Sequence, residues 1–131
     1  MTDVRQPGAG SSRARAGYER GGRTAEWLAA GVLLLKGYRI LECRARTSAG
    51  EIDIVAVRGR RIAFVEVKRR PTLAHAATAV APSQQARLHR AADAWVARYT
   101  RYRHHTRGFD RFEVARLWRF RHVIDALEAP R

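Results

Sequence analysis

The sequence contains one cysteine and no run of apolar residues long enough to cross a bilayer. The single thiol, Cys43, excludes an internal disulfide framework and is compatible with a reducing cytoplasm. No Cys/His spacing typical of a zinc site is present. The first twenty residues lack the apolar core of a signal peptide, and no lipidation motif follows. We therefore expect a cytoplasmic protein that does not bind membranes.

Acidic residues are also scarce. Twelve Asp and Glu residues stand against 26 Lys and Arg residues, so the formal net charge is +14. Such an excess is atypical of a metabolic enzyme with neutral substrates and favours a polyanionic partner, with nucleic acid first. The length of 131 residues predicts one domain over residues 21–131. Residues 1–20 have no apolar period and are predicted to form a flexible basic arm, which either contacts phosphates or has no role.

The most informative stretch runs from Gly50 to Lys68. Both of its halves are rich in β-branched residues, and the segment RGRR between them is a polar, glycine-containing break of hairpin length. We therefore predict two strands joined by a tight turn. Four charges interrupt these apolar strands, namely Glu51, Asp53, Glu66 and Lys68. A charge in such a place is costly unless it is paired, hydrogen-bonded or bound to a cation.

The register of the hairpin decides whether these charges meet. With a two-residue turn, Asp53 faces Glu66. Glu51 then faces Lys68, and all four side chains lie on one face of the hairpin. Facing carboxylates repel each other, and a divalent cation between them would reverse the sign of that interaction. Because carboxylate oxygens suit Mg²⁺ or Mn²⁺, we predict that Asp53 and Glu66 bind one of these metals. A turn of odd length would instead place the two acids on opposite faces of the hairpin.

Lys68 stands out in a chain that uses arginine as its usual cation. It is one of only two lysines among the 26 basic residues. An ammonium group is a compact point charge that can orient a water molecule or a developing anion. We predict that Lys68 is catalytic, and the alternative is a lysine at a strand end with no such role.

The spacing Asp-x(12)-Glu-x-Lys resembles the signature of the PD-(D/E)xK nuclease superfamily, whose fold is called restriction-endonuclease-like. More narrowly, the segments GYRILECRARTSAGEIDIVAV and IAFVEVKRR resemble the YraN-like family of uncharacterised bacterial proteins, which is related to Holliday-junction resolvases. The resemblance covers residues 17–127. The short signature recurs by chance in many sequences, and the longer combination of GEID with FVEVKRR is far more specific.

The pattern of the whole chain predicts an α/β fold with a mixed central sheet flanked by helices, in the order αβββαβ. In chain order the predicted elements are a helix over 24–36, a strand over 38–44, the hairpin over 50–68, a linker over 72–81, a helix over 82–101, a basic loop over 101–108, a strand over 112–117 and a short amphipathic element over 122–127. Connectivity and motif agree on this fold class.

The resemblance implies further site residues. In the family a glutamate on the first helix approaches the metal site, and Glu26 occupies that position here; an acid stabilised by the helix dipole is the alternative interpretation. The carbonyl of Val67 is expected to add a metal ligand. The family usually has lysine and glutamine at the start of the second helix. This chain has Gln84 and Gln85 there, so Gln85 is retained as a catalytic candidate and Gln84 departs from the family pattern.

Several arginines are candidates for binding nucleic acid because few acids balance them. Arg69 and Arg70 follow the hairpin, and Arg87, Arg90 and Arg98 lie on the second helix. A merely solvated helix face is the alternative for the second group.

Together these features predict a metal-dependent endonuclease or exonuclease that hydrolyses phosphodiester bonds in DNA, with branched or structured substrates favoured. Asp53 and Glu66 would bind Mg²⁺ or Mn²⁺, and Lys68 would orient the attacking water. The alternative is a non-catalytic, basic nucleic-acid-binding module that retains the nuclease fold. The sequence leaves a homodimer open.

Overall fold

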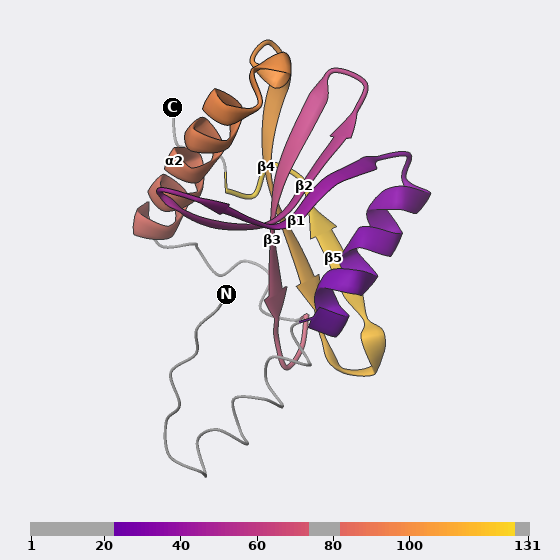
Figure 1. Ribbon diagram of the computed structural model, residues 1–131. Helices are drawn as coiled ribbons and strands as arrows, with labels where there is room; N and C mark the ends of the chain where they lie inside the picture. The colour runs from indigo at the N-terminus through magenta and orange to yellow at the C-terminus, as the bar shows by residue number, and fades with distance from the viewer. Residues whose placement is uncertain (1–22, 74–81, 128–131) are drawn as a thin grey trace.

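The computed structural model describes residues 23–73 and 82–127, and the predicted basic arm over residues 1–20 lies outside them. Five strands form one sheet in the order β1-β2-β3-β4-β5 (Figure 1). The strands are β1 (Arg39–Thr47), β2 (Gly50–Arg58), β3 (Arg61–Arg69), β4 (Thr106–Val114) and β5 (Phe120–Val123). Only β3 and β4 are parallel neighbours; the other three pairs are antiparallel. The predicted α/β class with a mixed sheet is confirmed.

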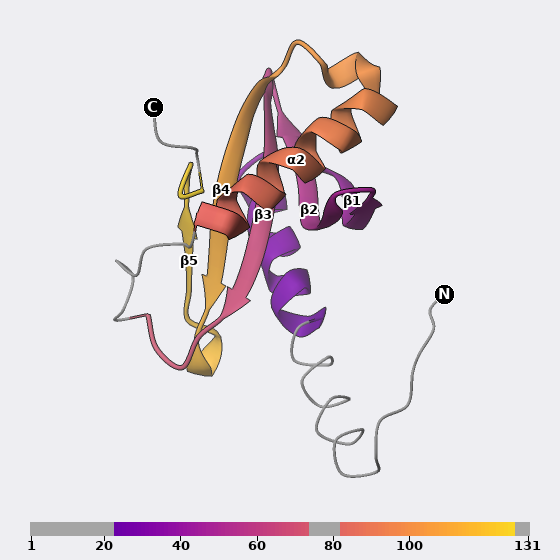
Figure 2. The ribbon, with the colours of Figure 1, turned by 90° about the vertical axis from the view of Figure 1, so that its left-hand side faces the viewer.

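Two helices cover opposite faces of this sheet (Figures 1 and 2). One is the N-terminal helix, described over residues 23–35, and the other is α2 (Pro82–Arg98). Strand alternation divides the core between them: Val55 and Val57 of β2 pack on the side of α2, and Ile54 and Ala56 pack on the side of the N-terminal helix. No helix in the described ranges is long and apolar enough to span a membrane.

The N-terminal helix ends at the predicted place. The amide of Tyr38 donates to the carbonyl of Leu33 at 2.9 Å, and that of Gly37 donates to Leu34 at 3.0 Å. These two bonds form a Schellman motif, in which Gly37 adopts the left-handed φ of +94° that glycine tolerates best. The motif turns the chain sharply into β1.

The β2–β3 hairpin has the predicted two-residue turn. Arg58 pairs with Arg61, and Gly59 between them has a φ of +59°. The regular pairing continues as far as Ile54 opposite Val65. The register of the hairpin is thereby confirmed, and the backbone ladder ends one residue before the acids.

The boundaries of the later elements differ from the prediction. The strand expected over 112–117 is β4 (Thr106–Val114), so the expected loop is wrong over 106–108 and the expected strand is wrong over 115–117. The polar start of β4 is extended because it pairs in parallel with the first residues of β3. The helix expected over 82–101 ends at Arg98 and is followed by a 3₁₀ turn, η1 (Thr100–Tyr102). The amphipathic element expected over 122–127 is instead the end of β5 followed by a turn.

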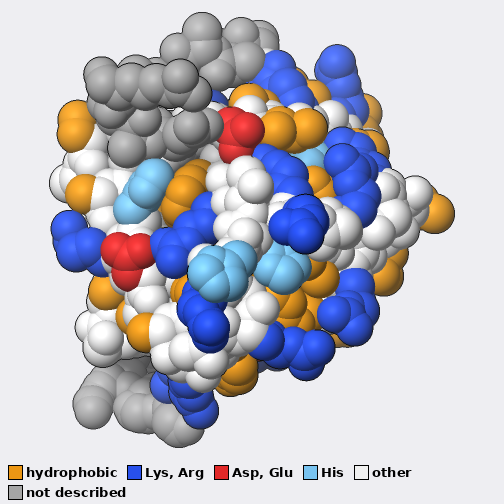
Figure 3. Space-filling model, turned by 90° about the horizontal axis from the view of Figure 1, so that it is seen from above, with side chains coloured by type: hydrophobic (Ala, Val, Ile, Leu, Met, Phe, Trp, Pro, Cys, Tyr) orange, Lys and Arg blue, Asp and Glu red, His pale blue; other side chains and the backbone are white. Residues whose placement is uncertain are grey.

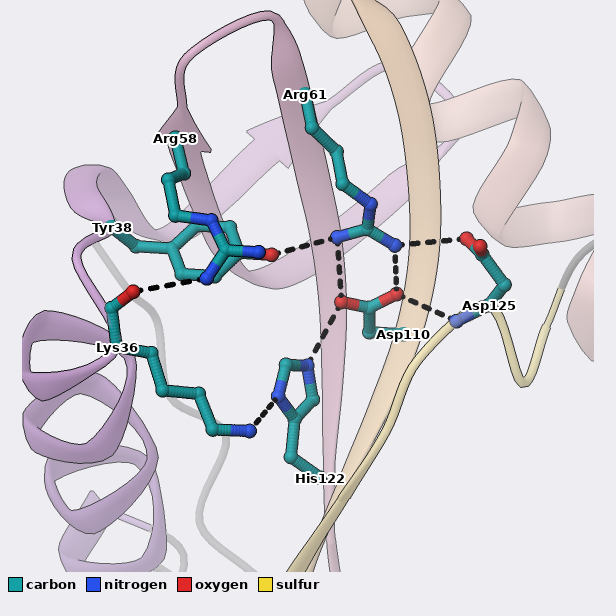
Figure 4. Close-up of polar contacts among 7 residues, drawn as sticks. All are labelled: Lys36, Tyr38, Arg58, Arg61, Asp110, His122 and Asp125. Atoms are coloured by element: carbon teal, nitrogen blue, oxygen red, sulfur yellow. Dashed lines mark hydrogen bonds and ion pairs between the residues drawn. The ribbon is translucent and has the colours of Figure 1, made fainter.

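A buried ion network ties β4 to the hairpin and to the N-terminal helix (Figure 4). The carboxylate of Asp110 is fully buried and accepts two hydrogen bonds from Arg61, at 2.7 and 3.1 Å. The ring of His122 lies 2.9 Å from Asp110 and 2.8 Å from the ammonium of Lys36. Burial alone would raise the pKa of Asp110, but the hydrogen bonds from His122 and Arg61 outweigh it and lower the pKa to about 2.

Because of this network, we expect a substitution at Gly108 to lower the stability of the protein. A Cβ at this position would overlap the guanidinium of Arg61. Gly108→Ala should therefore displace Arg61 from Asp110 and destabilise the protein by about 3 kcal/mol, the scale for breaking a buried ion pair. Urea unfolding measures the effect. The matched control is Gly31→Ala, because Gly31 lies in a helix with open space around it and should gain up to ~1 kcal/mol. Equal stability of Gly108→Ala and the parent would show that Arg61 relocates without cost.

Candidate active site

The predicted charges meet in one cavity on the α2 side of the sheet. Its volume is about 250 Å³. Seven residues line it: Glu51, Asp53, Glu66, Val67, Lys68, Arg87 and Leu88. The first two come from β2, the next three from β3 and the last two from α2. The hairpin therefore brings all four predicted charges together, and α2 adds an arginine.

Asp53 lies where the β2–β3 ladder ends. Its Oδ2 accepts a hydrogen bond from the Val67 amide at 2.7 Å, so a side chain takes the place of a backbone acceptor. Burial is the main cause that raises the pKa of Asp53, and the charges of Glu26, Glu66 and Glu51 add to it. Although the bond from Val67 opposes this shift, the pKa rises to about 6. Asp53 is thus a carboxyl group that changes charge close to neutral pH.

Lys68 and Glu66 form an ion pair at the open side of the cavity. The ammonium lies 3.5 Å from Oε1 of Glu66, and the two side chains are 38% and 15% exposed. Lys68 therefore reaches solvent while Glu66 stays mostly covered. This pair lines the same cavity as Asp53.

Two other predicted site residues lie outside the cavity lining. Glu26, on the N-terminal helix, accepts a hydrogen bond from Nε of Arg44 at 2.8 Å. Its charge still contributes to the raised pKa of Asp53, so it belongs to the surroundings of the site. Gln85 is half-buried in the first turn of α2. Val67 lines the cavity, and its amide is the group that contacts Asp53.

The predicted phosphate-binding arginines divide into three kinds. Arg87 lines the cavity and packs beside Gly50. Arg69, Arg90 and Arg98 are exposed. Arg70 contacts the carboxylate of Glu113 at 3.2 Å, so its charge is already partnered.

Sequence reasoning missed the buried acid that binds Arg70. Glu113 of β4 is fully buried and also contacts Arg111 and Arg121, at 3.0 and 2.6 Å. Burial would raise the pKa of Glu113, but these cations, with a hydrogen bond from Arg121, lower it. The alternating charges of the segment FDRFEV, inside an otherwise apolar strand, are the same kind of signal that identified the hairpin acids.

The carboxylates of Asp53 and Glu66 are oxygen groups of this cavity that could hold a metal. Among the described residues no group of three or more His, Cys, Asp or Glu side chains converges as a metal-binding cluster. Two carboxylates can nevertheless suffice for Mg²⁺, which keeps several of its waters and completes its shell with substrate phosphate oxygens. The arrangement suits a weakly held divalent cation beside an ammonium group.

Comparison with known proteins places the chain in a family. Residues 25–117 match the family described as Uncharacterised protein family UPF0102. The chain is 48% identical over 126 residues to a UPF0102 protein of Methylorubrum extorquens, covering 95% of this chain and 97% of the relative. It is 41% identical over 128 residues to one from Bradyrhizobium sp. (strain BTAi1), covering 98% and 94%. A UPF0102 protein of Maricaulis maris is 54% identical over 86 residues, covering 66% and 68%. The chain therefore belongs to the UPF0102 family, the YraN-like family that its sequence resembles.

Proposed function

We propose that this protein is a metal-dependent nuclease that hydrolyses phosphodiester bonds in DNA, with branched or structured substrates favoured. One observation carries the proposal: Asp53, Glu66 and Lys68, the three positions of the PD-(D/E)xK signature, line a single cavity together with Arg87. Residues thirteen and fifteen positions apart meet only because the hairpin has the register described above.

The surroundings of Asp53 support the proposal of a divalent cation. Asp53 is half-buried and has other negative charges near it, so its ionised form is costly without a nearby cation. Asp53 and Glu66 would bind Mg²⁺ or Mn²⁺, with the Val67 carbonyl and Glu26 as further candidate ligands. When bound, the cation would neutralise negative charge that develops on the scissile phosphate.

The protein's own side chains would orient the attacking water and bind the phosphate. Lys68, positioned by Glu66, would orient the attacking water, and Gln85 at the start of α2 is a second candidate for this task. Arg87 enters the same cavity and is placed to bind a phosphate oxygen. Arg69, Arg90 and Arg98 extend the basic surface beyond the cavity, whereas Arg70 is partnered by Glu113 and is a weaker candidate.

The alternative is a basic nucleic-acid-binding module without activity. It is favoured by the absence of a complete three-donor cluster among the described residues and by the Gln84 departure from the family's lysine. The single exposed cysteine fits a cytoplasmic location in either case. Oligomeric state, including a homodimer, is open to measurement in solution.

Cleavage assays with defined DNA separate these two functions. Labelled duplexes, flaps, four-way junctions and single strands would be incubated with the full chain in Mg²⁺, Mn²⁺ or EDTA. The nuclease proposal expects cleavage of at least one structured substrate with a divalent cation and none with EDTA. Binding without cleavage in any metal would favour the non-catalytic module.

DNA affinity should depend steeply on salt, because the formal net charge of +14 implies many contacts with phosphates. Fluorescence anisotropy with a labelled duplex in EDTA would give the dissociation constant between low and moderate salt. We expect log Kd to rise linearly with log salt, with a slope near 0.9 for each phosphate contact. A flat dissociation constant, or no binding at low salt, would remove nucleic acid as the partner.

A further inference from the structure

A second basic site lies at the other end of the β2–β3 hairpin. Many arginines of the described ranges contact carboxylates, among them Arg44, Arg61, Arg70, Arg107, Arg111 and Arg121. Within those ranges, Arg39, Arg58 and Arg101 are among several arginines that have no carboxylate partner. These three line one depression, which suggests a shared role rather than three separate solvated side chains.

This depression, here called the hairpin-tip pocket, has a volume of about 400 Å³. It is lined by Gly37, Arg39, Val57, Arg58, Gly59, Arg101, Tyr102 and His105. No acidic residue is among them. Figure 3 views the molecule from the top of Figure 1, where the hairpin turn and η1 lie, and shows Lys, Arg and His side chains gathered over this end.

Arg58 is fixed in the pocket by contacts that leave its charge uncompensated. Its guanidinium donates to the carbonyl of Lys36 at 3.0 Å and lies 4.6 Å from the centre of the Tyr38 ring (Figure 4). Tyr38 is buried, so it gives the guanidinium a rigid support. A carbonyl and an aromatic face orient a cation without neutralising it.

The ring of Tyr102 lies beside a second cation of the pocket. Tyr102 is 8% exposed, with the guanidinium of Arg101 5.5 Å from its ring centre and the ring of His105 5.2 Å away. The pocket therefore contains two guanidinium groups that lie beside aromatic rings. In the absence of an anion these like charges repel one another.

We propose that the hairpin-tip pocket binds a phosphate group. The planar fork of arginine matches phosphate oxygens and forms charge-assisted hydrogen bonds to them. Arg39, Arg58 and Arg101 supply that charge from β1, β2 and η1, and His105 supplies a further ring nitrogen. A bound phosphate converts the mutual repulsion of these side chains into attraction.

We assign the phosphate to a nucleic-acid backbone, because Arg98 lies on the same face of α2 as Arg87 of the candidate active site and the two sites are a few nucleotides apart. Arg87 lines the cavity, and Arg98 is exposed eleven residues later. Eleven residues make about three helical turns, so both lie on one face of α2, roughly 17 Å apart. Along β2, Asp53 and Arg58 are also separated by roughly 17 Å. This distance corresponds to about five nucleotides of one DNA strand.

The hairpin-tip pocket would thus anchor the backbone about five nucleotides from the position at which Asp53 and Glu66 act. The position of the cut relative to the anchor rests on the proposed nuclease function. Phosphate binding by the pocket does not rest on it and is tested without cleavage.

The test compares two double variants with equal loss of charge. Arg39→Gln with Arg101→Gln removes two pocket cations and retains Arg58, whose contact with Lys36 supports the fold. The control is Arg60→Gln with Arg103→Gln, because both residues are exposed at the same end of the molecule and neither lines the pocket. Both variants and the parent would be checked for equal thermal stability.

Two probes are used, both in EDTA. Inorganic phosphate is titrated while the NMR signals of the Gly59 and Tyr102 amides are followed, and a labelled 16-base-pair duplex is titrated by anisotropy. We expect the pocket variant to lose the phosphate-induced shifts, to bind the duplex about tenfold more weakly and to lower the salt slope by about 2. The control should retain the shifts and bind the duplex with nearly the parent affinity.

Other results decide against the proposal or part of it. If phosphate shifts are lost but duplex affinity equals that of the control, the pocket binds free phosphate and the nucleic-acid source is wrong. If both variants behave alike with both probes, only net charge matters and the pocket is no site. Parent protein that binds phosphate and the duplex as expected but cleaves no DNA would refute the nuclease function. Phosphate binding by the hairpin-tip pocket would still stand.

Discussion

Replacing Lys68 with arginine is expected to lower DNA cleavage by about a hundredfold or more, the scale for losing one positioned catalytic group. The positive charge is kept, so DNA affinity should hardly change. The structure gives the reason: the Lys68 ammonium lies 3.5 Å from one oxygen of Glu66 and reaches solvent at the open side of the cavity. A wide, planar guanidinium would pair with both oxygens of Glu66 and could not occupy the same point. Single-turnover cleavage and anisotropy in EDTA measure the two effects separately.

The control for this substitution is Arg60→Lys, which exchanges the same two side chains in reverse at the exposed hairpin turn, outside the residues proposed to bind nucleic acid. It should leave both cleavage and binding unchanged. Cleavage that survives in Lys68→Arg would show that the lysine only contributes charge. A parallel loss of binding and cleavage would instead point to a damaged cavity.

Replacing Asp53 with asparagine should stabilise the metal-free protein at alkaline pH. The folded state raises the pKa of Asp53 to about 6, above the ordinary value for aspartate. Folding therefore favours the protonated form of Asp53. The resulting contribution to the free energy of unfolding is fully present below pH 4 and is lost as the pH rises through 6. By pH 8 the ionised carboxylate costs on the order of 3 kcal/mol relative to acid conditions. The neutral amide of Asp53→Asn avoids that cost and can still accept the hydrogen bond from Val67.

Thermal unfolding at pH 4.5 and pH 8 in EDTA measures this effect. We expect the melting temperature of Asp53→Asn to exceed that of the parent by roughly 5 to 10 °C at pH 8, and by little at pH 4.5. Asp93→Asn is the control, since Asp93 is a largely exposed acid of α2 and should give no such gain. Added Mn²⁺ should stabilise the parent at pH 8 and not Asp53→Asn. A variant less stable than the parent at both pH values would mean that Asp53 is a structural acceptor and not a strained carboxylate.

The hairpin and its cluster of charges could be predicted from the sequence because both depend on local rules. The segment RGRR fixes a two-residue turn, and a turn of that length fixes which residues face one another. Charges inside apolar strands then identify the site, since alternation places Glu66 and Lys68 on one face. Gly37 likewise marks the end of the N-terminal helix because the Schellman motif requires a left-handed residue.

The extent of β4 and the buried ion networks depend on contacts between segments that are distant in the sequence. β4 lies between β3 and β5 with Asp110, Arg111 and Glu113 buried in it, so it has no clean apolar alternation to mark its start. Those acids are tolerated only because Arg61, Arg70 and Arg121 reach them from other strands or from the segment after β3. The pairing of Glu26 with Arg44 is of the same kind: residue spacing along the chain does not disclose it. Sequence reasoning thus found the charges of one hairpin and missed the networks that need three or more segments.

If Asp53 and Glu66 together bind a divalent cation, a Mn²⁺ titration followed by electron paramagnetic resonance should detect it. At pH 8 we expect one bound Mn²⁺ per chain for the parent, weaker binding at pH 5 because Asp53 is then mostly protonated, and no site in Asp53→Asn or Glu66→Gln. Glu42→Gln, which alters an acid of β1 outside the cavity lining, should bind like the parent. Parent protein that binds no Mn²⁺, or variants at Asp53 and Glu66 that bind it equally well, would show that these two acids do not form a metal site.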